Sequence, residues 1–354
     1  MIATHCFQKD WALAKRSELG GGDPTLIEKT VHAFALLCHL AHRGVPMVFK
    51  GGTSLILRLP RFRRLSIDID ILCPLPDNDL DTHLKQIALE PPFIRYEEDD
   101  RGHDRLPARR HFKFYYNSAV NNNSPEYVLL DVVKEEAQHP YVENIVIASS
   151  LFDVTGDIRV DVPVIESLLG DKLTAFAPCT VGVPCTPDYA MQVMKQLFDV
   201  GVLFDVASDF GRVAQAYDAI FAAENMYRDG AHTVEAALND SIETARLIGH
   251  FGLKGSAQNE QQILLERGRS SLTSHLCGTS FSGAQAKVAA AKAAYLATCL
   301  RDRNLDGIIR RRPFNPDGVG ELREIVLPDL VLQRLRGGNP EAFYYWALAL
   351  GLLS

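Results

Sequence analysis

Two aspartates, Asp68 and Asp70, occupy alternate positions in a segment whose intervening and flanking residues are Ile67, Ile69 and Ile71. In a β-strand, alternate side chains point to the same face, so both carboxylates converge on one site while the isoleucines need a buried face. Adjacent carboxylates repel each other unless a cation neutralises them, and carboxylate oxygens are ligands that Mg²⁺ prefers. The segment predicts a metal site on a packed sheet. The alternative is a solvated edge strand with outward-facing charges.

A third carboxylate, Asp131, interrupts the strongly apolar run 127–133. An unpaired carboxylate is costly to bury, so it needs a partner. An ion pair with Arg110 or Lys113 would provide one. Alternatively, the carboxylate completes a three-acid metal site with the first two aspartates. The sequence does not place these strands side by side, so both explanations remain open.

Two glycines, Gly51 and Gly52, lie between a short apolar strand expected over 47–49 and a helix expected over 53–59. Glycines at the start of a helix leave bare backbone N–H groups and the positive end of the helix dipole at one point. A triphosphate can bind at such a point. An ordinary tight turn is the alternative interpretation.

The elements around these residues follow from hydrophobic periodicity and from helix-start signals. A helix begins at Asp23-Pro24, runs to about His42 and is followed by Pro46. The first half of the chain then mixes strands and helices, and helical patterns dominate from Pro163 onward. We therefore predict an α+β fold with a domain boundary near residue 160, giving domains 1–160 and 161–354. The remaining expected elements are a helix over 77–88, strands over 66–72, 93–98, 111–117 and 127–134, two short strands within 142–158, and helices over 164–176, 190–205, 212–224, 231–251 and 283–300.

Composition limits the classes of function. The chain has 354 residues and a net charge of −7, which excludes a protein that coats polyanions through its overall charge. Any contact with nucleic acid must come from local basic clusters. Three such clusters occur: Arg58, Arg61, Arg63 and Arg64; Arg101, Arg105, Arg109 and Arg110; and Arg310, Arg311 and Arg312.

The sequence also predicts a location. The amino-terminal residues lack a basic start followed by an apolar run, so we expect no signal peptide. The longest apolar stretch, 343–353, is too short to span a bilayer. Seven cysteines without a CxxC pair are typical of reduced thiols. We expect a cytoplasmic protein that does not contact membranes.

Two motifs together carry a family resemblance. The segments Phe49-Lys50-Gly51-Gly52-Thr53-Ser54-Leu55 and Arg64-Leu65-Ser66-Ile67-Asp68-Ile69-Asp70 resemble the paired signature KGGT-x-L and R-x-S-x-D-x-D. This signature marks the AbiEii-like nucleotidyltransferases, the toxins of abortive-infection (type IV) toxin–antitoxin systems, which belong to the DNA polymerase β-like nucleotidyltransferase superfamily. The combined pattern is far more specific than either half.

Later residues extend the resemblance over roughly residues 30 to 210. Asp131 matches the family's third acid. Glu166, Lys172 and Ala175 match a helix pattern E-x-x-x-x-x-K-x-x-A. Lys195 and Asp199 match the pattern K-D-x-x-D, although Gln196 stands where the family has its first acid.

The resemblance implies a fold and a set of site residues. It implies an N-terminal nucleotidyltransferase domain with a small mixed sheet flanked by helices, and a helical domain that contributes to the cleft. Mg²⁺, with Mn²⁺ as an alternative, would be held by Asp68, Asp70 and Asp131, and Asp131 would help to deprotonate the acceptor. Lys172 would act on the β- and γ-phosphates as a catalytic residue. The expected nucleotide-binding residues are Lys50, Gly51, Gly52, Thr53, Ser54, Arg64, Ser66, Lys195 and Asp199.

The resemblance also implies the partners: a nucleoside triphosphate, an RNA acceptor such as the tRNA 3′ end, and a cognate antitoxin. Two alternatives remain open. One is nucleotidylation of a small molecule, as in antibiotic-modifying enzymes of the same superfamily. The other is a toxin that sequesters nucleotide without transferring it. Three acids argue against sequestration, because binding alone does not require them.

Overall fold

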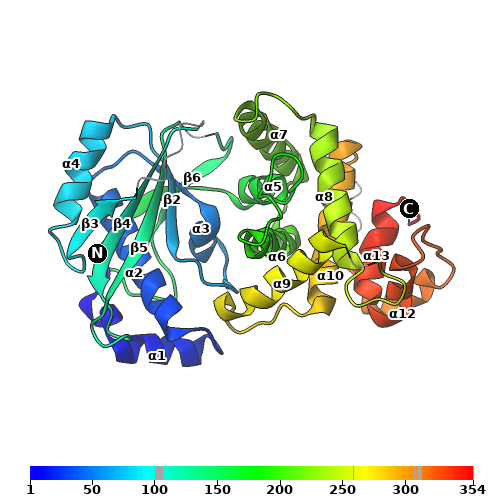
Figure 1. Ribbon diagram of the computed structural model, residues 1–354, viewed down its shortest axis with the longest axis horizontal. Helices are drawn as coiled ribbons and strands as arrows, with labels where there is room; N and C mark the ends of the chain where they lie inside the picture. Colours follow the sequence, from blue (N-terminus) through cyan, green and yellow to red (C-terminus); the bar gives the residue numbers. More distant parts are fainter. Residues whose placement is uncertain (100–106, 137, 258, 307, 309–312, 354) are drawn as a thin grey trace. The chain divides into compact units, whose positions relative to one another are not determined.

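A computed structural model describes residues 1–99, 107–136, 138–257, 259–306, 308 and 313–353. The chain divides into two compact units (Figure 1). The first unit comprises Met1–Gln138, Val142–Val164 and Ser274–Thr279. The second unit comprises His139–Tyr141, Ile165–Thr273 and Ser280–Ser354.

A seven-stranded mixed sheet forms the centre of the first unit, in the order β3-β4-β5-β2-β1-β7-β6. β2 pairs in parallel with β5, and β1 pairs in parallel with β7, whereas the other neighbours are antiparallel. The predicted mixed sheet flanked by helices is confirmed. The strands are β1 (Val48–Lys50), β2 (Asp68–Leu72), β3 (Arg95–Glu98), β4 (Arg109–Asn117), β5 (Pro125–Val133), β6 (Val142–Val146) and β7 (Arg159–Pro163).

The long helix α2 (Pro24–His42) covers one face of this sheet. Asp23 caps it by accepting a hydrogen bond from the Thr25 backbone N–H at 2.8 Å, with proline in the first helical position. Most of its apolar side chains are buried in one core with the inward-facing residues of β2, such as Ile69 and Ile71. The other helices of this unit are η1 (Thr4–Phe7), α1 (Lys9–Glu18), α3 (Gly51–Arg58) and α4 (Asp77–Ile87).

The second unit is helical. Five of its described α-helices begin at polar side chains that accept a hydrogen bond from a first-turn backbone N–H, namely Asp209, Thr233, Asn259, Ser282 and Asn339. In the part of the chain that the structure describes, no helix could cross a membrane. The helices are α5 (Ile165–Ala175), α6 (Ala190–Val206), α7 (Phe210–Met226), α8 (Val234–Gly249), α9 (Glu260–Ser271), η2 (Leu272–His275), α10 (Gly283–Arg301), η3 (Pro316–Leu322), η4 (Leu332–Arg334), α12 (Leu335–Gly338) and α13 (Pro340–Ala349).

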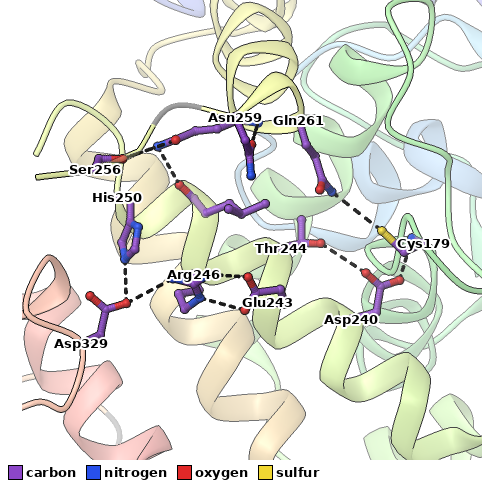
Figure 2. A network of polar contacts seen from close by, with 12 residues as sticks. Cys179, Asp240, Glu243, Thr244, Arg246, His250, Ser256, Asn259, Gln261 and Asp329 are labelled. Atoms are coloured by element: carbon purple, nitrogen blue, oxygen red, sulfur yellow. Dashed lines mark hydrogen bonds and ion pairs between the residues drawn. The ribbon is translucent and has the colours of Figure 1, made fainter.

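Polar contacts fix α8 within the second unit (Figure 2). Asp329 accepts hydrogen bonds from His250 at 2.8 Å and from Arg246 at 3.3 Å. On the same helix, Asp240 accepts hydrogen bonds from the Cys179 backbone N–H at 2.7 Å and the Thr180 hydroxyl at 2.9 Å. The helix is therefore tied both to the turn after α5 and to the segment before η4.

The structure differs from the sequence prediction in several elements. The last strand of the sheet, β7, covers Arg159–Pro163, whereas the sequence predicts two strands within 142–158. Pro163 ends a strand, and α5 covers Ile165–Ala175 where the sequence predicts a helix over 164–176. Ile67 precedes β2 and is half-buried, so only the other two isoleucines form the buried face of that strand. Helices α1, α9, α12 and α13 have no counterpart in the sequence prediction.

A segment from much later in the chain completes the first unit. The Leu65 backbone N–H donates to the His275 carbonyl at 2.7 Å, and the Cys277 backbone N–H donates to the Arg63 carbonyl at 3.0 Å. Between them, Arg64 and Leu276 form an antiparallel bridge. The residues that lead into β2 are therefore held by a short strand-like pairing with 274–279.

Candidate active site

One row of charged side chains crosses the centre of the sheet in the first unit. Lys50 on β1 lies opposite Asp70 on β2, and Asp70 lies opposite Asp131 on β5. Asp131 in turn lies opposite His111 on β4. Residues in register on neighbouring strands point to the same face. The structure therefore places two of the three predicted acids and the predicted Lys50 in one row, and it adds a histidine.

The strand that carries Asp68 and Asp70 is internal. β2 has neighbours on both sides, so the alternative of a solvated edge strand is wrong. Ile69 and Ile71 are fully buried against the core, whereas both aspartates are half-buried on the opposite face. The strict alternation of the sequence thus separates the core from an acidic face of the sheet.

Gly51 is fitted against the carboxylate of Asp70. Its φ of +75° lies in the left-handed region, and a Cβ atom built on it would lie 1.9 Å from Asp70 Oδ2. A Cβ on Gly52 would lie 2.4 Å from an Arg64 guanidinium nitrogen and 3.0 Å from the Ser66 hydroxyl. A side chain at either position would have to displace an acidic or basic side chain of the second motif, because these lie directly against the turn.

The polar side chains around this turn hold the backbone in place. The Thr53 hydroxyl donates to the Asp68 carbonyl at 2.5 Å, and the Ser54 hydroxyl donates to the Gly51 carbonyl at 2.8 Å. Both side chains are fully buried, and Arg64 is only 6% exposed. These residues therefore fasten the glycine turn to β2, and both hydroxyl groups are engaged by backbone carbonyls.

Asp131 has a partner that the sequence did not identify. His111 Nδ1 lies 2.6 Å from Asp131 Oδ1, on the neighbouring strand. The two basic residues expected to pair with Asp131 bind elsewhere: Arg110 contacts Glu98 at 2.7 Å, and Lys113 contacts Asp99 at 3.0 Å. Residues 110 and 132 face the opposite side of the sheet from 111 and 131, because side chains alternate along each strand.

His111 could have been found from the hairpin. The turn-rich segment 121–125 separates two predicted strands, and a hairpin around it pairs position 117 with 125 and position 111 with 131. This register depends on the length of the turn, which the motifs themselves do not contain.

The donor set fits a hard divalent cation. Asp68, Asp70 and Asp131 offer carboxylate oxygens, which suit Mg²⁺ and Mn²⁺ better than softer ions. Among the described residues, three ligand atoms within 4.8 Å of one another are found at a different place in the first unit and not at the three acids. Side chains must therefore rotate before one ion can contact all three carboxylates. Asp70 and Asp131 need the smaller adjustment, because they lie opposite each other on adjacent strands.

Lys29 on α2 is a further basic residue near the acids. Its Nζ lies 4.5 Å from the ring centroid of Tyr127, which shares a face of β5 with Asp131. Burial lowers the pKa of Lys29, while Glu126 and Asp68 act in the opposite direction. The sequence showed no signal for Lys29 beyond its place on an amphipathic helix.

The remaining predicted residues belong to the second unit. Lys172 on α5 is 5% exposed, and its Nζ lies 3.8 Å from Asp171. Asp199 on α6 is almost fully buried, and Lys195 precedes it by one helical turn. Helices α5 and α6 pack against each other. A buried lysine and a buried aspartate on packed helices require polar partners, which surface residues would not.

Glu166, the first residue of the α5 motif, has a defined structural role. One carboxylate oxygen accepts hydrogen bonds from the Ser208 backbone N–H and hydroxyl, each at 3.0 Å. The backbone N–H of Asp209 also donates to it, at 3.3 Å. These contacts fasten the link between α6 and α7 to the start of α5.

The basic clusters are less available than the sequence suggests. Arg58 donates to the Pro163 carbonyl at 2.8 Å and pairs with Glu143 at 2.6 Å. With Arg64 buried as well, Arg61 and Arg63 are the exposed members of the first cluster. In the second cluster, Arg109 is exposed. The predicted basic residues Arg101, Arg105, Arg310, Arg311 and Arg312 lie outside the described residues.

Comparisons with known proteins identify relatives of the chain. The family described as "Nucleotidyl transferase AbiEii toxin, Type IV TA system" matches residues 35–269. No curated protein matches the sequence. The family match covers the acids of β2 and β5 as well as the lysines of α5 and α6.

Two solved structures are similar in part. An antigenic nucleotidyltransferase-like protein from Paracoccidioides brasiliensis is 13% identical, with 62% of this chain and 94% of that chain covered and a TM-score of 0.38. The nucleotidyltransferase toxin MenT4 from Mycobacterium tuberculosis H37Rv is also 13% identical, with 78% of this chain and 94% of that chain covered and a TM-score of 0.38.

Proposed function

The chain belongs to the AbiEii nucleotidyltransferase toxin family of type IV toxin–antitoxin systems, and from this membership we propose that it transfers a nucleotide from a nucleoside triphosphate to a hydroxyl group of an RNA. The 3′ end of tRNA is the proposed acceptor. A cognate antitoxin is the proposed protein partner.

One observation carries the proposal. Asp70 and Asp131 lie opposite each other on adjacent parallel strands, and Gly51 leaves just enough room for the Asp70 carboxylate. This arrangement places a carboxylate pair beside a glycine turn at the start of α3. A phosphate at such a turn and a cation on the carboxylates would lie close together, which is the requirement for phosphoryl transfer.

Asp68, Asp70 and Asp131 would hold Mg²⁺. When bound, two such ions would supply positive charge to the phosphate oxygens and align the reacting groups. The backbone N–H groups of the Gly51-Gly52 turn would orient the triphosphate. Lys50, in the same row as Asp70, would add a positive charge beside it.

Asp131 is the proposed base. In the reaction, the acceptor hydroxyl oxygen bonds to the α-phosphorus, the bond to pyrophosphate breaks, and the hydroxyl proton passes to the Asp131 carboxylate. The contact between His111 and Asp131 Oδ1 at 2.6 Å fixes the orientation of this carboxylate. His111 is therefore a positioning residue in the proposal.

Three residues of the second unit complete the proposal. Lys172 would stabilise the charge that develops on the departing pyrophosphate, because an ammonium group in a shielded environment interacts strongly with phosphate oxygens. Lys195 and Asp199 are proposed to assist nucleotide binding. The burial of Lys172 and Asp199 supports a role that a surface residue would not need, whereas Lys195 is half-buried.

A labelling experiment tests the proposal. The purified protein is incubated with Mg²⁺, total RNA and each of the four nucleoside triphosphates labelled at the α-phosphate. We expect label in RNA with the wild type. Asp68→Asn and Asp70→Asn should each abolish it, because the amide keeps the volume but removes the charge. Asp79→Asn, at an exposed position of α4, is the matched control and should retain full activity.

The contrary outcomes are distinct. Near wild-type turnover in either aspartate variant would refute the carboxylate site. Transfer of label to small hydroxyl compounds but not to RNA would show that the acceptor is a small molecule. Tight nucleotide binding with no transfer to any acceptor would favour sequestration.

A further inference from the structure

The first unit contains a second cluster of metal-ligating side chains, away from the three acids in sequence and in chemistry. Ligand atoms of His5, Cys6 and Asp153 all lie within 4.8 Å of one another. His5 Nε2 is 2.8 Å from Asp153 Oδ2, and the Asp153 backbone N–H donates to Cys6 Sγ at 3.3 Å. We propose that His5, Cys6 and Asp153 form a site for a borderline transition-metal ion such as Zn²⁺.

The backbone around this cluster is fixed by contacts that do not involve the three side chains. Ile2 and Val154 form an antiparallel bridge, and the Ala3 backbone N–H donates to the Asp153 carbonyl at 2.9 Å. The Trp11 indole N–H donates to the Leu151 carbonyl at 3.0 Å. Two segments distant in the sequence are thus held together before any ion binds, so little ordering is needed to form the site.

The donor types determine the preferred ion. An imidazole nitrogen, a thiolate sulfur and a carboxylate oxygen are the three ligands that Zn²⁺ binds in proteins, usually in a tetrahedral site. A thiolate does not suit Mg²⁺, which prefers oxygen ligands. The site therefore differs in metal preference from the acidic row on the sheet. A water molecule would complete the coordination, since His5 and Asp153 are both exposed.

Binding would exchange protons for the metal ion. The ion would take the place of the hydrogen bond between His5 and Asp153, with His5 neutral and its ring proton on Nδ1, and the Cys6 thiol would release its proton to solvent. Burial raises the pKa of this thiol, and a bound ion would favour its thiolate form. Lys15 is the nearby cation that acts on Cys6, and its ammonium is paired with Glu18 at 2.7 Å.

The consequence is a metal cross-link between the amino-terminal segment and the loop before β7. An ion that binds the folded protein but not the unfolded chain raises the thermal midpoint of unfolding. We expect Zn²⁺ to do so for the first unit, whereas an equal concentration of Mg²⁺ should not act through this site.

Cobalt titration tests the proposal, because Co²⁺ reports on its ligands by absorption. Chelator-treated full-length protein is titrated with Co²⁺ and then with Zn²⁺. We expect one equivalent of Co²⁺ with a thiolate-to-cobalt charge-transfer band, displaced by Zn²⁺. Cys6→Ser should remove the band, and His5→Ala and Asp153→Asn should each weaken binding by about tenfold or more.

The controls separate this site from other ligands. Cys179→Ser changes an exposed thiol in the second unit, and it should leave the band intact. Asp70→Asn should also leave it intact, which keeps this test independent of the proposed transfer reaction. His5 and Asp153 are exposed, so their variants should fold even if Cys6→Ser does not. The proposal is overturned if no thiolate band forms, if Cys179→Ser removes it, or if His5→Ala and Asp153→Asn bind Co²⁺ as the wild type does.

Discussion

At the scale of single residues, the active-site proposal depends on two glycines and the side chains against them. Gly51 has a positive φ and lies against the Asp70 carboxylate, so the motif's glycine and its aspartate are a single steric unit. Substituting either one changes the position available to the other. This coupling explains why the two halves of the motif occur together.

The first prediction at this scale concerns Gly51→Ala. The left-handed backbone costs about 1–2 kcal/mol for any residue with a Cβ. The added Cβ must also displace the Asp70 carboxylate, so transfer activity should be lost. Gly44→Ala is the matched control, because Gly44 has a φ of +70° and open space where the Cβ would lie. Both variants should lose stability by chemical denaturation, Gly51→Ala at least as much as Gly44→Ala because of the clash with Asp70, but only Gly51→Ala should lose activity. Equal activity of the Gly51→Ala and Gly44→Ala variants would show that transfer does not require Asp70 in its present position.

A second prediction concerns Lys172, which is buried on α5. If its ammonium stabilises the leaving phosphates, Lys172→Ala should lower the single-turnover rate by about 10²-fold while weakening nucleotide binding much less. Lys172→Met should do the same with less loss of packing, and Lys172→Arg should recover only part of the rate. A structural lysine would instead change stability and leave the rate per folded molecule unchanged. A wild-type single-turnover rate in Lys172→Ala would remove Lys172 from the mechanism.

At the scale of elements, helix α2 carries a buried histidine that makes the stability of the first unit depend on pH. His32 on α2 stacks on Tyr116 of β4 with a centroid distance of 3.6 Å, and its Nδ1 lies 2.9 Å from the Glu28 carbonyl. Burial lowers the pKa of His32 from 6.5 to about 4. In the same network, the Glu28 carboxylate binds Ser118 at 2.6 Å, which holds the loop between β4 and β5. The helix thus positions the hairpin that pairs His111 with Asp131.

The prediction at this scale is a pH dependence of stability. Between pH 6.5 and about 4, the unfolded imidazole of His32 binds a proton and the folded one does not. The contribution of a neutral His32 to the free energy of unfolding is therefore complete above pH 6.5, and it is lost as the pH falls towards 4. The loss is on the order of 3 kcal/mol.

His32→Phe keeps the stacking and should flatten this slope. Denaturant midpoints measured from pH 7 to pH 4 on both proteins give the comparison. His42→Phe, at an exposed position of the same helix, controls for loss of a histidine. An unchanged slope in His32→Phe would show that other groups cause the acid sensitivity.

At the scale of the whole molecule, family membership connects the chain to growth control. A toxin of a type IV system is expected to arrest the growth of a bacterial host when it is produced alone. We predict that induced wild-type protein arrests growth and that the Asp70→Ala form does not, because the arrest requires nucleotide transfer. Growth curves and viable counts at matched protein levels provide the measurement. Equal toxicity of both forms would indicate sequestration or a non-specific effect.

The sequence by itself determined the residues that lie near one another along the chain and their local geometry. The alternation of Asp68-Ile69-Asp70 predicted a strand with one acidic and one buried face, and the structure has both. The cap at Asp23-Pro24 located the start of α2, and the glycine pair located the junction of β1 and α3. Such features depend on neighbouring residues, whose geometry is fixed by backbone sterics and local hydrogen bonds.

Only the tertiary structure decided which distant residues meet. The parallel pairing of β2 with β5 places Asp131 beside Asp70, and the hairpin register gives Asp131 a histidine partner in place of Arg110 or Lys113. Likewise, residues 274–279 join the first unit, and Asp153 meets His5 and Cys6. Strand order and register depend on how the whole core packs, because a shift of one residue would turn every side chain to the other face. No local pattern contains that information.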